Sequence, residues 1–225
     1  MIGFAWLAAT IVIYEALRRV YVARPRVYTL PVLVTTLLLG ATLLAFRLDL
    51  GAYADGTEAL LWLLGPSTVA LAVPLVRERA LLVRHARAIL VGVGAGAISG
   101  LVSAVLLARA MHLPALLVRS VAPKSVTTPV AMPLAASLGG NPEIAAAVAV
   151  VTGMFGMAFG PAILSRVRVR TSLARGIALG AASHGIGTAA AMGEGQRTGA
   201  ASAVAMVVAA VIIAIVAAPL VWLLT

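Results

Sequence analysis

The sequence predicts an all-α polytopic membrane protein, built as an inverted-repeat, transporter-like bundle with two broken or re-entrant helices. Three observations predict this architecture: an apolar composition, arginine clusters between apolar stretches, and an internal repeat. Of the 225 residues, 62% are apolar and 11% are charged, and the mean hydropathy is +1.09. A soluble domain holds roughly 45–50% apolar and about 25% charged residues. The excess of apolar residues therefore places the chain in a membrane.

Six apolar stretches are long enough to cross a bilayer, for which about 20 residues are needed. The first begins at the N-terminus, MIGFAWLAATIVIYEAL, which lacks the positive n-region and cleavage site of a removed signal peptide. The others are expected at residues 27–46, 59–76, 88–108, 141–164 and 199–224. Two further apolar stretches, 113–138 and 173–192, are interrupted by proline, glycine and hydroxyl residues.

Arginine clusters indicate the orientation of these spans. The clusters are Arg18, Arg19, Arg24 and Arg26; Arg77, Arg79, Arg84 and Arg87; and Arg166, Arg168, Arg170 and Arg175. The loop at 47–58 is instead acidic, with Asp49, Asp55 and Glu58. By the positive-inside rule the clusters face the cytoplasm and the N-terminus faces out. Most of the net charge of +10 thus sets topology, and we expect no nucleic-acid partner.

The orientation makes the first interrupted stretch a re-entrant hairpin. Span 88–108 ends outside and span 141–164 starts outside, so residues 113–138 leave and return to the same side. Their length allows two legs of about 13 residues, too short for two crossings. The tip is expected near Lys124 to Pro129. Inverted symmetry predicts a second hairpin, 173–198, entering from inside; if 173–192 crosses instead, the C-terminus lies inside.

An internal repeat with an offset of 60 residues relates the two interrupted stretches. Residues 122–132, APKSVTTPVAM, align with residues 182–192, ASHGIGTAAAM, which sets Lys124 over His184 and Thr128 over Thr188. One unit begins inside and the other outside, and such inverted repeats with interrupted helices are recurrent in transporters. The predicted parts are N-terminal scaffold or oligomerisation helices (1–76), a first repeat unit (79–138), a second (139–198) and a C-terminal helix (199–225).

The interrupted helices predict a binding site for a small carboxylate at the membrane midplane. A half-helix that starts after a break directs free N–H groups and a positive dipole end at a ligand, and a lysine inside an apolar stretch is usually functional. The predicted substrate-binding residues are Lys124, Ser125, Thr127, Thr128, His184, Gly185, Gly187 and Thr188. In the alternative interpretation the hydroxyls only bond neighbouring backbone, and Lys124 snorkels to the outer interface.

His184 is also the candidate for proton coupling, because an imidazole changes charge between about pH 5 and 8 and the midplane stretches hold no Asp or Glu for a sodium site. Backbone carbonyls freed at the breaks leave sodium open as the coupling ion. No dinucleotide or phosphate-binding glycine motif, nucleophile triad or metal-ligand cluster is found. We therefore expect no enzyme, no cofactor and no metal.

Four motifs resemble those of the LrgB/CidB family. They are GPSTVALAVP at 65–74, APKSVTTPVAM at 122–132, FGP at 159–161 and SHGIGT at 183–188. The likeness covers roughly residues 10–224. The chain departs from the family pattern after the fourth motif, where AAAMGEGQR replaces an Ala-Arg-Ala followed by an acidic segment and Glu194 is the acid that remains.

The resemblance implies two competing functions. One family member, in plant plastids, is a glycolate/glycerate translocator, and bacterial members are linked to pyruvate uptake. These members imply a secondary transporter of small 2-hydroxy or 2-oxo monocarboxylates. Other members are described as antiholin-like modulators of murein hydrolase export, acting beside a small holin-like (LrgA/CidA-like) subunit. We also expect a homo-oligomer, surrounded by lipid, in a bacterial or archaeal cytoplasmic membrane.

Overall fold

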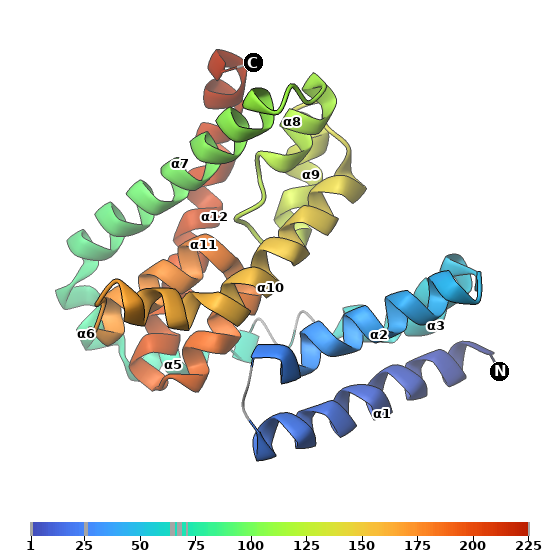
Figure 1. Ribbon diagram of the computed structural model, residues 1–225. Coiled ribbons are helices and arrows are strands. Elements are labelled where there is room, and N and C mark those ends of the chain that lie inside the picture. The colour runs from blue at the N-terminus through green and yellow to red at the C-terminus, as the bar shows by residue number, and fades with distance from the viewer. Residues whose placement is uncertain (1, 25–26, 64–65, 67–68, 71, 225) are drawn as a thin grey trace. The chain divides into compact units, whose positions relative to one another are not determined.

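The computed structural model describes residues 2–24, 27–63, 66, 69–70 and 72–224, and the regular structure of these residues is entirely helical. The chain divides into two compact units, Met1–Ala70 and Leu71–Thr225, whose helices are labelled in Figure 1. The predicted all-α membrane fold is confirmed. The division into four parts made from the sequence stays a prediction.

The first unit contains α1 (Ile2–Ala23), a short 3-10 helix (Val27–Thr29), α2 (Pro31–Ala45) and α3 (Leu50–Trp62). Helix α1 packs against both α2 and α3, and the rings of Trp6 and Tyr53 meet edge to face at 5.5 Å. Two expectations need correction here. Helix α2 has 15 residues, fewer than the expected span 27–46, and most of the expected loop 47–58 is helical because the Asp49 carboxylate caps α3 by accepting from the Gly51 N–H.

The second unit contains the remaining helices. They are α5 (Ala72–Arg77), α6 (Arg79–Arg84), α7 (Ala86–Ala110), α8 (Ala115–Val121), α9 (Thr128–Ser137), α10 (Pro142–Arg166), α11 (Ser172–Gly193) and α12 (Gln196–Leu224). Among the described residues, α7, α10 and α12 are long and apolar enough to cross a membrane. They correspond to three of the six expected spans. The expected span 59–76 and the motif at 65–74 fall partly outside the described residues.

The first hairpin, residues 115–137, consists of α8, a turn and α9. The chain beyond α9 returns to the last turn of α8, because the Ser120 hydroxyl accepts a 2.7 Å hydrogen bond from the Asn141 N–H. The turn between the legs spans residues 122–127, where the tip was predicted, and Pro123 in it is fully buried. The chain thus folds back at the predicted tip, and its entry from the outer side of the membrane stays a prediction.

The second hairpin is α11 itself, which folds back at His184. The backbone of His184 has φ 43° and ψ −135°, and Arg175 near the start of α11 pairs with Glu194 at its end. The stretch therefore returns to the end of the unit from which it came, as the predicted second hairpin requires. The break lies at His184, not at the glycines that were expected to loosen this stretch. Gly187 instead allows the legs to touch, since a Cβ there would lie 2.6 Å from the Leu179 carbonyl oxygen.

The second unit has two chemically different ends. At the arginine-rich end, Arg197 lies 3.7 Å from Glu78, and the Arg175 guanidinium donates to the carbonyl of Val169. Because Arg175 also pairs with Glu194, close to Arg197 in the chain, the clusters at 77–87 and 166–175 lie at the same end of this unit. That this end faces the cytoplasm stays a prediction. At the opposite end, Arg109 of α7 donates to the carbonyl of Leu224, so α7 and α12 run side by side and end together (Figure 1).

Helix α12 packs directly on the second hairpin. A Cβ on Gly176 would lie 2.4 Å from the carbonyl oxygen of Thr198, and one on Gly180 would lie 2.2 Å from that of Ser202. The backbones touch without intervening side chains, which is the packing that small residues permit between membrane helices. The second hairpin and α12 therefore form one closely packed body.

Candidate functional site: a cavity between α7 and the second hairpin

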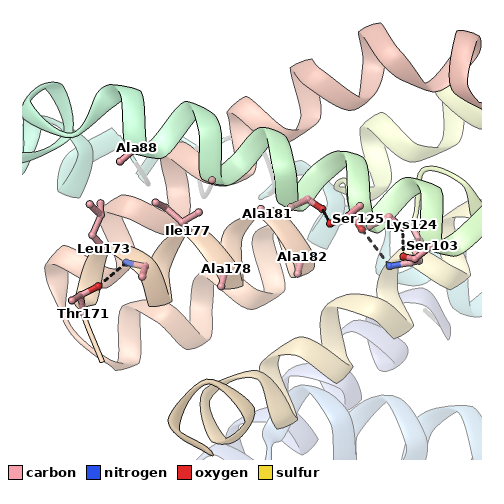
Figure 2. A pocket seen from close by; sticks show the side chains of 15 residues that line it. Ala88, Ser103, Lys124, Ser125, Thr171, Leu173, Ile177, Ala178, Ala181 and Ala182 are labelled. Carbon is pink, nitrogen blue, oxygen red and sulfur yellow. Dashed lines mark hydrogen bonds between the residues drawn. The ribbon is translucent and has the colours of Figure 1, made fainter. Parts of the chain in front are cut away.

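A cavity of about 760 Å³ runs between α7 and the first leg of the second hairpin. Its lining extends from Ala88 and Thr171 at the arginine-rich end to Ser103, Lys124 and Ser125, as Figure 2 shows. From Ala88 to Ser103 the cavity follows α7 for about 22 Å at 1.5 Å per residue. It therefore joins the arginine-rich end to the tip of the first hairpin.

Lys124 and Ser125 supply the charged and polar groups at the end of this cavity that lies away from the arginine-rich end. The Lys124 ammonium donates to the Ser125 hydroxyl at 3.4 Å, and Lys124 is half-buried while Ser125 is 3% exposed. An ammonium has three N–H donors, so donors remain for a ligand. A Cβ on Gly100 would lie 3.2 Å from the Ser125 hydroxyl, so a glycine makes room for this tip against α7.

Thr127 and Thr128 begin the second leg of the first hairpin. Thr127 is the N-cap of α9 and makes no side-chain capping bond, and both threonines are half-buried. A Cβ on Gly185 would lie 3.9 Å from the Thr127 methyl group, so the two hairpin tips approach each other. Neither threonine lines the cavity, although both lie close to residues that do.

His184 points away from the cavity. Its Nε2 lies 2.9 Å from the carbonyl oxygen of Ala149 on α10, so Nε2 carries the proton and donates. A Cβ on Gly153 would come within 2.8 Å of the ring, which shows that this glycine makes room for the imidazole. His184 is 3% exposed. Its side chain thus fastens the tip of the second hairpin to α10.

Thr188 lies in a buried polar chain on the α12 side of the second hairpin. Its hydroxyl donates to the His184 carbonyl at 2.8 Å, so the 2.9 Å contact with Ser202 is a bond donated by the Ser202 hydroxyl. Thr188 is 0% exposed. Of the eight residues predicted from the sequence, the structure brings Lys124 and Ser125 to the cavity, places Gly185 by Thr127, and puts His184, Gly187 and Thr188 in packing contacts within the bundle.

A bidentate ion pair holds the base of the second hairpin beside the cavity mouth. Arg175 donates to both carboxylate oxygens of Glu194 at 2.6 Å, and to the Pro161 carbonyl at 3.0 Å. The side chains of Arg175 and Glu194 are 14% and 21% exposed. The acid that remains after the fourth motif therefore has a structural partner.

Three polar residues of the cavity were missed by sequence reasoning: Ser99, Ser103 and Thr171. Ser99 and Ser103 lie on α7, in the expected span 88–108, to which the sequence assigned no ligand contacts. A pattern in the sequence does point to them, since Gly92, Gly96, Ser99, Gly100 and Ser103 follow one helical face. Small residues of this kind usually allow close helix packing, but on this face of α7 they line the cavity.

The family model described as the LrgB-like family matches residues 10–223. The chain belongs to the LrgB-like family. Among proteins of Bacillus subtilis (strain 168), this LrgB-like protein is 40% identical to the uncharacterized protein YxaC over 187 residues, which cover 83% of this chain and 81% of YxaC.

Two further relatives from the same organism match this LrgB-like protein. The uncharacterized protein YwbG is 36% identical over 190 residues, 84% of either chain. The antiholin-like protein LrgB is 31% identical over 144 residues, 64% of this chain and 62% of LrgB. No solved structure matches. Family membership and the three apolar helices together make this an integral membrane protein.

Proposed function

We propose that this protein is a secondary transporter of small 2-hydroxy or 2-oxo monocarboxylates, of the pyruvate, glycolate, lactate and glycerate class, that works by alternating access. The observation that carries the proposal is the cavity that leads from the arginine-rich end to Lys124, the one lysine of the chain. An ammonium at the end of an otherwise apolar and hydroxyl-lined passage suits a carboxylate. The cavity volume lies in the range of about 300–1,000 Å³ that is usual for small-ligand sites.

The proposed substrate site is the set predicted from the sequence, with Lys124 and Ser125 as the direct carboxylate contacts. The hairpin tips carrying Thr127, Thr128 and Gly185 complete it from the other side when the bundle changes conformation. His184, Gly187 and Thr188 hold the second tip in place. We further propose that the protein works in the cytoplasmic membrane as a homo-oligomer.

Uptake into liposomes that contain only this protein tests the proposal. We expect uptake of labelled glycolate, lactate or pyruvate by the parent protein. Lys124→Met keeps the length of the side chain but removes its charge, and losing a charged partner from a desolvated carboxylate costs ~2–5 kcal/mol. The half-saturation concentration should therefore rise by at least about 30-fold.

Arg87→Met is the matched control, because Arg87 is an exposed cation on the first turn of α7 and does not line the cavity. It should transport like the parent. Equal transport by Lys124→Met and the parent contradicts the site. A parent protein that takes up none of these acids but binds a small holin-like subunit supports the antiholin-like regulator instead, the role after which the relative LrgB is named.

We propose proton coupling through His184. Because Nε2–H is bonded to Ala149, Nδ1 is the nitrogen that takes up the transported proton, and protonation changes the charge at the tip of the second hairpin. With sodium absent, an inward-directed proton gradient should stimulate uptake by the parent but not by His184→Gln. Equal stimulation of both proteins removes the histidine from the mechanism.

A further inference from the structure

Two serines of α7 present only hydrogen-bond acceptors to the cavity. The Ser99 hydroxyl donates to the Gly96 carbonyl and the Ser103 hydroxyl donates to the Gly100 carbonyl, each at 3.1 Å. A hydroxyl has one proton and two lone pairs. Both protons are thus directed into the helix, and the lone pairs face outward. Because both residues line the cavity, these lone pairs are open to a ligand.

The two serines lie near the lysine. Ser103 lies one turn beyond Ser99. It shares the end of the cavity away from the arginine-rich end with Lys124 and Ser125 (Figure 2). Ser103 bonds the carbonyl of Gly100, and a Cβ on Gly100 would lie 3.2 Å from the Ser125 hydroxyl. The Ser125 hydroxyl in turn lies 3.4 Å from the Lys124 ammonium. The donors of Lys124 and the acceptors of the α7 serines therefore line the same cavity.

We propose that Ser99 and Ser103 are specificity-determining residues that accept a hydrogen bond from a donor group next to the carboxylate of the ligand. The inference rests on the proposed function and narrows it. A 2-hydroxy acid brings the carboxylate for Lys124 and a hydroxyl proton for a serine. A 2-oxo acid of the same size has only acceptors. To donate a hydrogen bond to its oxo group, a serine must give up the bond that its hydroxyl donates to a carbonyl of its own helix.

The intrahelical bond by itself does not carry the inference. Ser137 of α9 makes the same kind of bond, to the Leu134 carbonyl at 2.7 Å, and Ser137 is exposed outside the cavity. What distinguishes Ser99 and Ser103 is their place on the cavity wall beside the lysine. Ser137 therefore offers a control with matched chemistry and a different location.

Competition between lactate and pyruvate in liposomes that contain this protein tests the inference, because the two acids differ only at carbon 2. We expect the parent to prefer lactate by about five- to tenfold in half-saturation concentration, as the one neutral hydrogen bond that the lactate hydroxyl can donate would give. In the double variant Ser99→Ala, Ser103→Ala the preference should fall below about twofold through weaker lactate uptake, with pyruvate unchanged within about twofold.

The control variants separate selection from general damage. Ser137→Ala should keep the parental preference, and Ser103→Thr should keep it because the hydroxyl remains. Alanine is a strong helix former, so the double variant is expected to fold. A parent without lactate preference, or a double variant that keeps it, overturns the inference and leaves the transporter in place. A parent that takes up neither acid overturns the proposed function and this inference with it.

Discussion

At the residue scale, His184 combines a strained backbone with a side chain that fills a specific place. Its φ of 43° lies in the left-handed region, where a residue other than glycine costs of order 1–3 kcal/mol. The side chain offsets that cost through the bond from Nε2 to Ala149 and through the fit of the ring against Gly153. A histidine here is held by α10, so the tip keeps its shape.

Replacing His184 should reverse the usual order of alanine and glycine in a helix. Both His184→Ala and His184→Gly lose the bond to Ala149, but only glycine adopts φ 43° without strain. We expect His184→Gly to unfold at a higher temperature than His184→Ala, by an amount that corresponds to about 1 kcal/mol. Thermal unfolding of the two variants in detergent is the measurement, and a more stable alanine variant contradicts the strained tip.

The sequence predicted Lys124 and Ser125 because a single lysine stands inside an apolar stretch. It predicted the break near residue 184 because the internal repeat aligns that stretch with the first one. It did not find the direction of His184, since a side chain in a break can turn to either flanking helix. It also did not find Ser99 and Ser103. Glycine at every third or fourth position predicts a close helix contact, and only the packed bundle shows that this face of α7 also borders a cavity along the first leg of the second hairpin.

At the scale of elements, the second hairpin depends on the pair between Arg175 and Glu194. The two residues are 19 apart in the chain, and no local pattern predicts their contact. The pair ties the two legs together, and the bond to Pro161 ties them to α10. The symmetry of the repeat predicted the hairpin, while the ion pair that closes it became visible only in the structure.

A double-mutant cycle measures this ion pair. Arg175→Ala and Glu194→Ala should each lower the free energy of unfolding, and the double variant should lose less than the sum of both. We expect a coupling of ~1–3 kcal/mol, as for hydrogen bonds between charged groups with limited exposure. Arg19 and Glu15, an exposed pair on α1, provide the comparison and should show a smaller coupling, because solvent screens an exposed ion pair. Strict additivity for Arg175 and Glu194 would show that the base of the hairpin closes without them.

At the scale of the whole molecule, the second hairpin determines where the chain ends. Because that hairpin returns to the arginine-rich end, α12 starts there and finishes beside Arg109 at the opposite end. The positive-inside rule puts the arginine-rich end in the cytoplasm. We therefore expect the C-terminus to lie outside the cytoplasm.

Reporter fusions test this arrangement. Alkaline phosphatase fused after Thr225 should be active and green fluorescent protein fused there should be dark, since the first needs an exported and the second a cytoplasmic location. The same reporters inserted after Arg168, at the arginine-rich end, should give the opposite result. A fluorescent C-terminal fusion would contradict the outward C-terminus.

The backbone contact between the second hairpin and α12 has a mechanical consequence. Gly176 and Gly180 leave no layer of side chains that could slide, so a movement that widens or shuts the cavity carries α12 along. With 29 residues, α12 is a lever of about 43 Å, and its far end is fastened to α7 through Leu224 and stacked under the Arg119 guanidinium through Trp222. We therefore expect a displacement at the arginine-rich end of this unit to be transmitted along α12 to its opposite end.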